Sequence, residues 1–262
     1  MKYLKKFETQ SGYTEAYSEL ILPNVSLVTE NNKVYCNPLL PPQPDHDYVE
    51  IAGVKWATMN VGANSVTDYG RYFQWADTEG DVLTQDKQFT KNFDWSTCPY
   101  TQSGGSGSGS GSGSVTMLKY NGNDGKTRLE AIDDAATATL GVNWRMPTSE
   151  EFDSLIQNTT QTFVEDYEGS DVDGWLFTSI TDTNKKLFFP FCGRASQYYL
   201  EYGDNGYYWA SDFDTTNVEF AHFVQLYTYD VQKNTNERFY GLSIRPVYDE
   251  GYGLRNNNEE EG

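Results

Sequence analysis

Few side chains in this sequence could do covalent or metal chemistry. It contains two histidines, His46 and His222, and three cysteines, Cys36, Cys98 and Cys192. His222 sits in an apolar segment where a strand histidine is usually structural, and no nucleophile-elbow sequence is present to build a Ser-His-acid triad. The cysteines are better explained as buried or half-buried free thiols. We therefore predict that the chain is not an enzyme and has no catalytic residue and no cofactor.

The segment 196–240 offers non-covalent chemistry instead. Eight of the 20 tyrosines fall in it, mixed with asparagine, aspartate and serine. Tyrosine supplies a large rigid contact area and a polar tip at low entropic cost, and the small polar residues add adaptable hydrogen bonds, as in an antibody paratope. Tyr207, Tyr208 and Trp209 are expected to be a framework strand that fills the core, so they are left out of the predicted site. The predicted ligand-binding residues are Tyr198, Tyr199, Tyr202, Asp204, Asp212, Phe213, Asp214, Thr215, Asn217, Tyr227, Tyr229, Asp230, Asn234 and Asn236.

Charge and composition limit the classes of partner. The formal net charge is −19 and the sequence pI is about 4.3, which argues against nucleic acid, because phosphate binding needs a basic surface. No apolar run approaches the ~20 residues of a membrane span. The basic start at Lys2, Lys5 and Lys6 lacks a following apolar stretch, so we expect no signal peptide. An odd number of distant cysteines fits synthesis in the cytoplasm.

The elements that must position the candidate residues indicate an α+β domain. Helices are expected at 131–140 and 149–157, and the second has a capping box, with Thr148 as N-cap and Glu151 three residues later. Strands are expected at 54–59, 71–75, 187–192, 207–210, 221–227 and 242–247. In the last of these, Arg245 is expected to pair with a buried carboxylate.

The chain is expected to have four parts. Residues 1–38 form a small attachment or oligomerisation module, with a helix at 9–20 and two strands, 25–28 and 34–36, around a turn. A proline-rich linker follows at 39–47. The ligand-binding domain spans 48–248 and contains a flexible Gly-Ser loop at 103–114, either a natural insertion or an engineered replacement of a longer loop. The acidic tail 249–262 is expected to be disordered.

Five motifs in order resemble a known family. They are VKWATMNVG at 54–62, YGRYFQW at 69–75, WRMPT at 144–148, GYYWAS at 206–211 and GLSIRPV at 241–247. Together they are similar to the "major paralogous domain" proteins of gut bacteria and their phages. The resemblance implies a C-type-lectin-like fold of the variant shared with formylglycine-generating enzymes. It also implies that the three segments of the predicted site meet at one end of the domain.

Activities and metal sites of related proteins do not fit these residues. A three-histidine iron site needs more histidines than one chain has, and the formylglycine-generating enzymes need a cysteine pair where only Cys192 is present. The tripeptide Gln43-Pro44-Asp45 occurs as a calcium ligand in galactose-type lectins, but here it lies in the linker and its Trp-Asn-Asp companion is missing. Asp204, Asp212 and Asp214 could attract calcium, although a solvated acidic rim is the simpler interpretation. We predict no metal site.

The resemblance favours a phage tail or tail-fibre receptor-binding protein. Some family members are variable proteins of diversity-generating retroelements, whose mutable residues cluster before the final strand. The expected partners are a host-surface glycan or protein and other virion tail proteins, with a homotrimer as one assembly and no nucleic acid or membrane. The expected location is the virion tail. A bacterial adhesin-like binding protein is the alternative, and a formylglycine-generating-type enzyme is a third, less favoured one.

Overall fold

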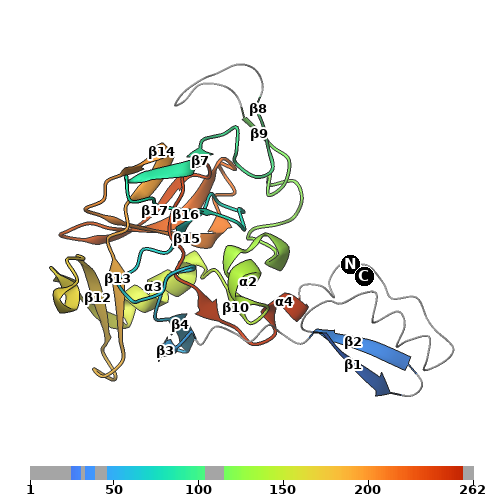
Figure 1. The fold of residues 1–262 in the computed structure, drawn as a ribbon, viewed down its shortest axis with the longest axis horizontal. Coiled ribbons are helices and arrows are strands. Elements are labelled where there is room, and N and C mark those ends of the chain that lie inside the picture. Colours follow the sequence, from blue (N-terminus) through green and yellow to red (C-terminus); the bar gives the residue numbers. More distant parts are fainter. Residues whose placement is uncertain (1–24, 31–32, 39–45, 104–114, 256–262) are drawn as a thin grey trace. The chain divides into compact units, whose positions relative to one another are not determined.

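The structure is a computed structural model that describes residues 25–30, 33–38, 46–103 and 115–255 (Figure 1). It divides into two units, Met1–Gln43 and Pro44–Gly262. The first contains a β-hairpin in which β1 (Val25–Glu30) pairs antiparallel with β2 (Lys33–Pro38). This pairing confirms the prediction of two strands around a turn. The predicted helix at 9–20 and residues 39–45 of the predicted linker lie outside the described residues.

The second unit is rich in β-structure, so the α+β prediction is wrong. Strands make up 41% of the described residues and helices 12%. The C-type-lectin-like fold expected together with that class is therefore not retained. Many strands were not predicted, among them the polar segments 194–201 and 231–237. Pairing with neighbouring strands overrides their weak strand propensity.

A three-stranded antiparallel sheet forms the centre of the unit (Figure 1). Its strands are β15 (Gly206–Phe213), β16 (Phe220–Leu226) and β17 (Val231–Glu237). Successive side chains of a strand point to opposite faces, and here both faces of β15 are covered. Tyr208 packs in one hydrophobic cluster and Trp209 in the other, each with 0% exposure. The predicted core role of this aromatic strand is confirmed.

The remaining strands form small sheets around this centre. One sheet has the order β10 (Trp144–Arg145), β18 (Val247–Tyr248), β4 (Val54–Ala57) and β3 (Tyr48–Ile51). Another contains β11 (Thr159–Val164), β12 (Gly174–Ser179) and β13 (Lys186–Pro190). The two-stranded pairs are β14 (Arg194–Glu201) with β7 (Gln88–Phe93), β5 (Arg71–Tyr72) with β6 (Asp81–Val82), and β8 (Thr101–Ser103) with β9 (Val115–Met117).

The helices are short, and local sequence signals determine the bounds of the longest one, α3 (Ser149–Gln157). This helix has the predicted bounds, and its capping box between Thr148 and Glu151 is confirmed. The expected helix at 131–140 is broken at Asp134, which leaves the 3-10 turn η1 (Ala131–Asp133) and α2 (Ala135–Leu140). The break follows from side-chain capping, because the Asp134 carboxylate accepts the free backbone N–H groups that begin α2. A second 3-10 turn is η2 (Tyr167–Gly169).

The C-terminal segment differs from prediction in two ways. Residues 242–247 do not form one strand; they make single bridges to Phe73 and Tyr208 before β18 begins. The tail is also packed at its start, where α4 (Tyr252–Arg255) buries Tyr252 to 4% exposure. The domain therefore extends beyond residue 248, and 256–262 lie outside the described residues.

The Gly-Ser run connects two paired strands. Residues 104–114 lie outside the described part of the chain, but β8 and β9 on either side pair from Thr101↔Met117 to Ser103↔Val115. The run therefore joins the two strands of a β-hairpin. None of the helices in the described part of the chain has the length and apolar character needed to cross a bilayer.

Candidate functional site

The predicted site residues lie at two ends of the central sheet, not at one. In the β15–β16 hairpin the turn 214–219 follows Phe213, whereas Gly206 pairs with Leu226 at the other end. The loops before β15 and after β16 therefore lie together, about 25 Å of strand away from the turn. Tyr202, Asp204, Tyr227, Tyr229 and Asp230 belong to the first end. Asp212, Phe213, Asp214, Thr215 and Asn217 belong to the second, and the expectation of a single site is wrong.

Several residues of the second end have structural roles. Phe213 is 3% exposed and packs edge-on against Trp75, so it is a core residue and not part of a binding surface. Asp212 accepts hydrogen bonds from the Ser149 backbone N–H (2.7 Å) and hydroxyl (2.6 Å) at the start of α3. Asp214 holds its own turn through Thr216, which lowers the pKa of the Asp214 carboxyl. Thr215 and Asn217 remain exposed in that turn.

Asn234 and Asn236 lie on β17. Asn236 is 9% exposed and pairs with Ala221 in the β16–β17 register, so it is largely withdrawn from solvent. Asn234 is exposed and pairs with Phe223 in the middle of the strand. A binding role fits Asn234 better than Asn236.

Exposed tyrosines lie in the loops of the first end and on β14, which begins next to the Gly193–Gly206 bridge at that end and pairs with β7. Exposure is 45% for Tyr198, 55% for Tyr199, 57% for Tyr202 and 77% for Tyr229. Tyr227 is half-buried and stacks on Tyr229, with ring centroids 5.4 Å apart and planes at 15°. We call this surface the tyrosine face. Its members are Tyr198, Tyr199, Tyr202, Asp204, Tyr227, Tyr229 and Asp230.

An arginine that was not predicted organises one side of the tyrosine face. The Arg194 guanidinium lies over the ring of Tyr240 at 4.0 Å and over that of Tyr202 at 5.0 Å. It also forms an ion pair with Glu201 at 3.0 Å. Cation–π contacts of this kind stabilise ring orientation. No local pattern marks Arg194, since it meets Tyr240 only through the tertiary fold.

Buried partners hold the rest of the face. The Tyr207 hydroxyl accepts a hydrogen bond from the Gln225 amide (2.9 Å), and burial raises its pKa to about 12. The Trp175 indole N–H donates to the backbone carbonyl of Tyr227 (2.7 Å), which fixes the loop after β16. Tyr202 has a φ of 49°, a left-handed conformation uncommon for a bulky residue. These contacts describe a surface set on a rigid frame.

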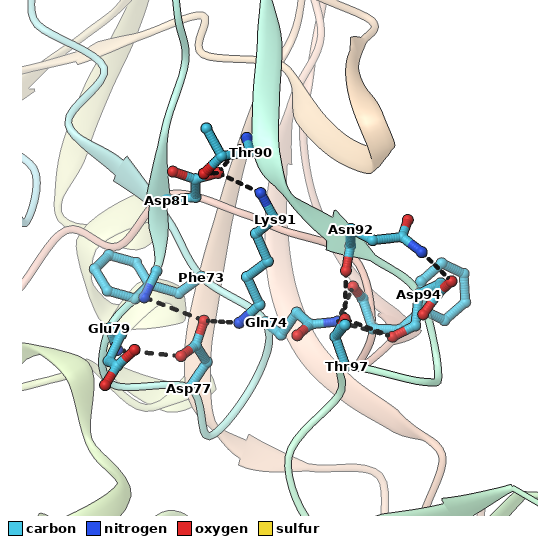
Figure 2. Close-up of polar contacts among 12 residues, drawn as sticks. Phe73, Gln74, Asp77, Glu79, Asp81, Thr90, Lys91, Asn92, Asp94 and Thr97 are labelled. Carbon is cyan, nitrogen blue, oxygen red and sulfur yellow. Dashed lines mark hydrogen bonds and ion pairs between the residues drawn. The ribbon is translucent and has the colours of Figure 1, made fainter.

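A polar network supports Phe239 and Tyr240, the second of which lies under the Arg194 guanidinium. The Gln74 amide donates to the carbonyl of Phe239 (3.0 Å) and to that of Asp94 (2.9 Å). Figure 2 shows the latter contact together with the Asp77–Lys91 ion pair and the hydrogen bonds that Asp81 accepts. The Phe239 ring packs against Tyr240 with centroids 4.2 Å apart. The network thus anchors the segment that carries Tyr240.

The residues suited to covalent chemistry are placed for structure. Burial raises the thiol pKa of both Cys98 and Cys192, so these cysteines stay protonated and are poor nucleophiles. His222 lies 3.8 Å from Asp212, the carboxylate already bound to the start of α3. Within the described ranges, no three His, Cys, Asp or Glu side chains are grouped so as to hold a metal ion. The tripeptide Gln43-Pro44-Asp45 lies outside the described residues, so the expectation that it binds no cation stays a prediction.

Arg245 has a different environment from the one predicted. It is 0% exposed, and its bonds go to the Asn60 side chain and to the carbonyls of Ala57, Thr58 and Phe188. No carboxylate pairs with it among the described residues, so the predicted buried ion pair is wrong. Burial lowers the pKa of Arg245 to about 10. The guanidinium has five N–H donors, so it can bind carbonyl oxygens of two chain segments without any carboxylate partner.

Comparison with known proteins adds no relative: no family model, no curated protein and no solved structure matches this chain. The resemblance of the five motifs therefore stays a prediction.

Proposed function

We propose that this chain is a receptor-binding protein of a phage tail, which attaches to a ligand on the host surface through the tyrosine face. The single observation that carries the binding role is the set of tyrosines between 45% and 77% exposed on a strand frame. Burying such rings against a partner is favourable, whereas leaving them in water brings the isolated domain nothing. The phage assignment rests on the five motifs.

Diversification by a retroelement is the second part of the proposal, and burial restricts which positions can vary. Exposed positions such as Tyr199, Tyr202 and Tyr229 tolerate replacement, because surface substitutions usually change stability by less than about 0.5 kcal/mol. Phe213 lies in the core, where truncation costs about 3–5 kcal/mol. Variation is therefore expected at the tyrosine face and not at Phe213.

The test is binding of the fluorescently labelled full chain to a panel of gut bacterial strains. Replacing Tyr199, Tyr202 and Tyr229 by alanine should weaken binding by at least ~10-fold, because stacked aromatic anchors dominate such interfaces. The melting temperature should change little. The matched control is Tyr48→Ala, since Tyr48 is 45% exposed on β3, outside the face.

Binding of the triple variant at wild-type strength would place the ligand site elsewhere. Loss of the melting transition would instead show that the three rings belong to the core. A chain that binds none of the strains would count against host attachment.

A further inference from the structure

We propose that the partner recognised by the tyrosine face is a polypeptide surface that carries lysine or arginine side chains. This inference rests on the proposed function, because it names the chemical class of ligand for the same surface.

The charges of the face are not balanced. Its cation Arg194 is paired with Glu201, and the nearby Lys233 is paired with Asp153. Asp204 and Asp230 are exposed, and within the described residues neither has an ion-pair partner. In the described part of the chain, the Asp204 carboxylate accepts a hydrogen bond from Asn205, and the Asp230 carboxylate accepts those of Val231 and Gln232. Two carboxylates are therefore left to meet cationic groups of a partner.

The tyrosine rings add attraction for the same groups. The face of an aromatic ring carries negative charge density that attracts ammonium and guanidinium groups. The structure contains one example, since the Arg194 guanidinium lies over the rings of Tyr202 and Tyr240. The exposed rings of Tyr198, Tyr199 and Tyr229 have no cation over them among the described residues. These rings can therefore make the same cation–π contact with lysine or arginine side chains of a partner.

Other ligand classes fit this surface less well. A phosphate-rich or otherwise anionic ligand would approach two unpaired carboxylates on a chain of net charge −19, which is repulsive. A neutral glycan could stack on the tyrosines and donate hydroxyl hydrogen bonds to Asp204 and Asp230, but it carries no positive charge to neutralise these carboxylates. The basic polypeptide uses both the rings and the carboxylates.

The experiment measures binding of the full chain to an immobilised peptide of alternating arginine and glycine. The matched probe is the same peptide with citrulline, a neutral isostere, in place of arginine. The arginine peptide should bind at least ~10-fold more tightly. Its affinity should fall as sodium chloride rises from about 0.05 to 0.5 M, because salt screens exposed charges. Equal binding of both peptides would overturn the inference.

Three double variants show whether the tyrosine face itself binds the arginine peptide, and the two acidic pairs among them remove the same charge. Asp204→Asn with Asp230→Asn should weaken binding of the arginine peptide by ~5-fold or more, as should Tyr199→Ala with Tyr229→Ala. Glu50→Gln with Glu150→Gln removes the same charge from exposed positions on β3 and α3, and it should keep affinity within about 2-fold. Equal losses in both acidic pairs would mean that overall charge binds the peptide, and would overturn the inference.

The inference about arginine and the proposed host attachment can be contradicted independently of each other. If the chain binds cells through its tyrosines but ignores arginine, host attachment stands, the inference falls, and a neutral glycan becomes the better ligand. If the face binds the arginine peptide and no cells, the inference stands and host attachment falls.

Discussion

At the scale of single residues, Asp134 illustrates how burial and hydrogen bonding oppose each other. Its carboxylate is 0% exposed and accepts the backbone N–H groups of Ala136 (2.9 Å), Thr137 (3.2 Å) and Met146 (2.8 Å). These donors favour the ionised form, whereas loss of hydration disfavours it. Burial outweighs the donors and raises the pKa of Asp134 to about 6.

The raised pKa predicts a pH dependence of stability. Because the folded state binds the Asp134 proton more tightly than the unfolded state does, its contribution is fully present below about pH 4. It is lost as the pH rises to about 6, and is constant above that. Relative to Asp134→Asn, which does not titrate, the free energy of unfolding of the wild type should fall by up to ~3 kcal/mol over this window. Urea unfolding at several pH values measures the difference.

Asp81 provides a control of opposite sign. Burial would raise its pKa, but hydrogen bonds from Lys91 and Thr90 (Figure 2) and from Val82 outweigh burial and lower it. The wild type should therefore lose stability relative to Asp81→Asn as the pH falls through the acidic range. If both comparisons moved in the same direction, the burial argument for Asp134 would be wrong.

At the scale of elements, Asp212 connects a strand to a helix. It lies on β15 and accepts hydrogen bonds from both the backbone N–H and the hydroxyl of Ser149, the first residue of α3. The first N–H groups of a helix have no partner within it, so an external carboxylate satisfies one of them and complements the helix dipole. The aspartate that was predicted to bind ligand therefore holds two elements together.

This role predicts a loss of stability without a loss of binding. Asp212→Ala should lower the free energy of unfolding by about 1–3 kcal/mol, because it leaves buried donors of Ser149 unpaired. Binding to bacteria or to the arginine peptide should stay at the wild-type level. Asp214→Ala, in the neighbouring exposed turn, should cost less and serves as the control. A drop in affinity for Asp212→Ala alone would return this residue to the binding site.

At the scale of the whole molecule, the two units are expected to be separable. Both hydrophobic clusters lie in the second unit, from Ile51 to Val247. A domain with its own core can fold alone, so a chain that starts at Pro44 should keep its melting temperature within about 3 °C, a shift below ~1 kcal/mol. Circular dichroism on both chains measures this.

Light scattering on the same two chains tests the assembly role expected of residues 1–38. If that segment drives assembly, removing it should lower the number of chains per particle, obtained from the molar mass, and leave the melting temperature unchanged. An unchanged number of chains per particle would remove assembly from its roles in the isolated protein. A large fall in melting temperature would show that the first unit stabilises the second.

Local signals made part of this structure predictable from sequence. α3 begins and ends where its capping box and apolar spacing place it, because a cap acts within four residues. The aromatic run at 207–209 was predictable as core, since a strand that is covered on both faces can bury three large rings in succession. The tyrosines at 198, 199, 202 and 229 were also singled out, by composition alone.

The tertiary structure decided everything that depends on distant partners. Arg245 bonds to Asn60, 185 residues away in sequence, and no pattern near Arg245 shows that its partners are carbonyls. The hairpin of β15 and β16 places Asp212 and Phe213 far from Tyr202 and Tyr229, although all four residues lie in the same tyrosine- and aspartate-rich segment of the sequence. The sequence determines which side chains can recognise a ligand. Strand pairing determines which of them reach the same surface, because it alone fixes which end of a sheet each loop occupies.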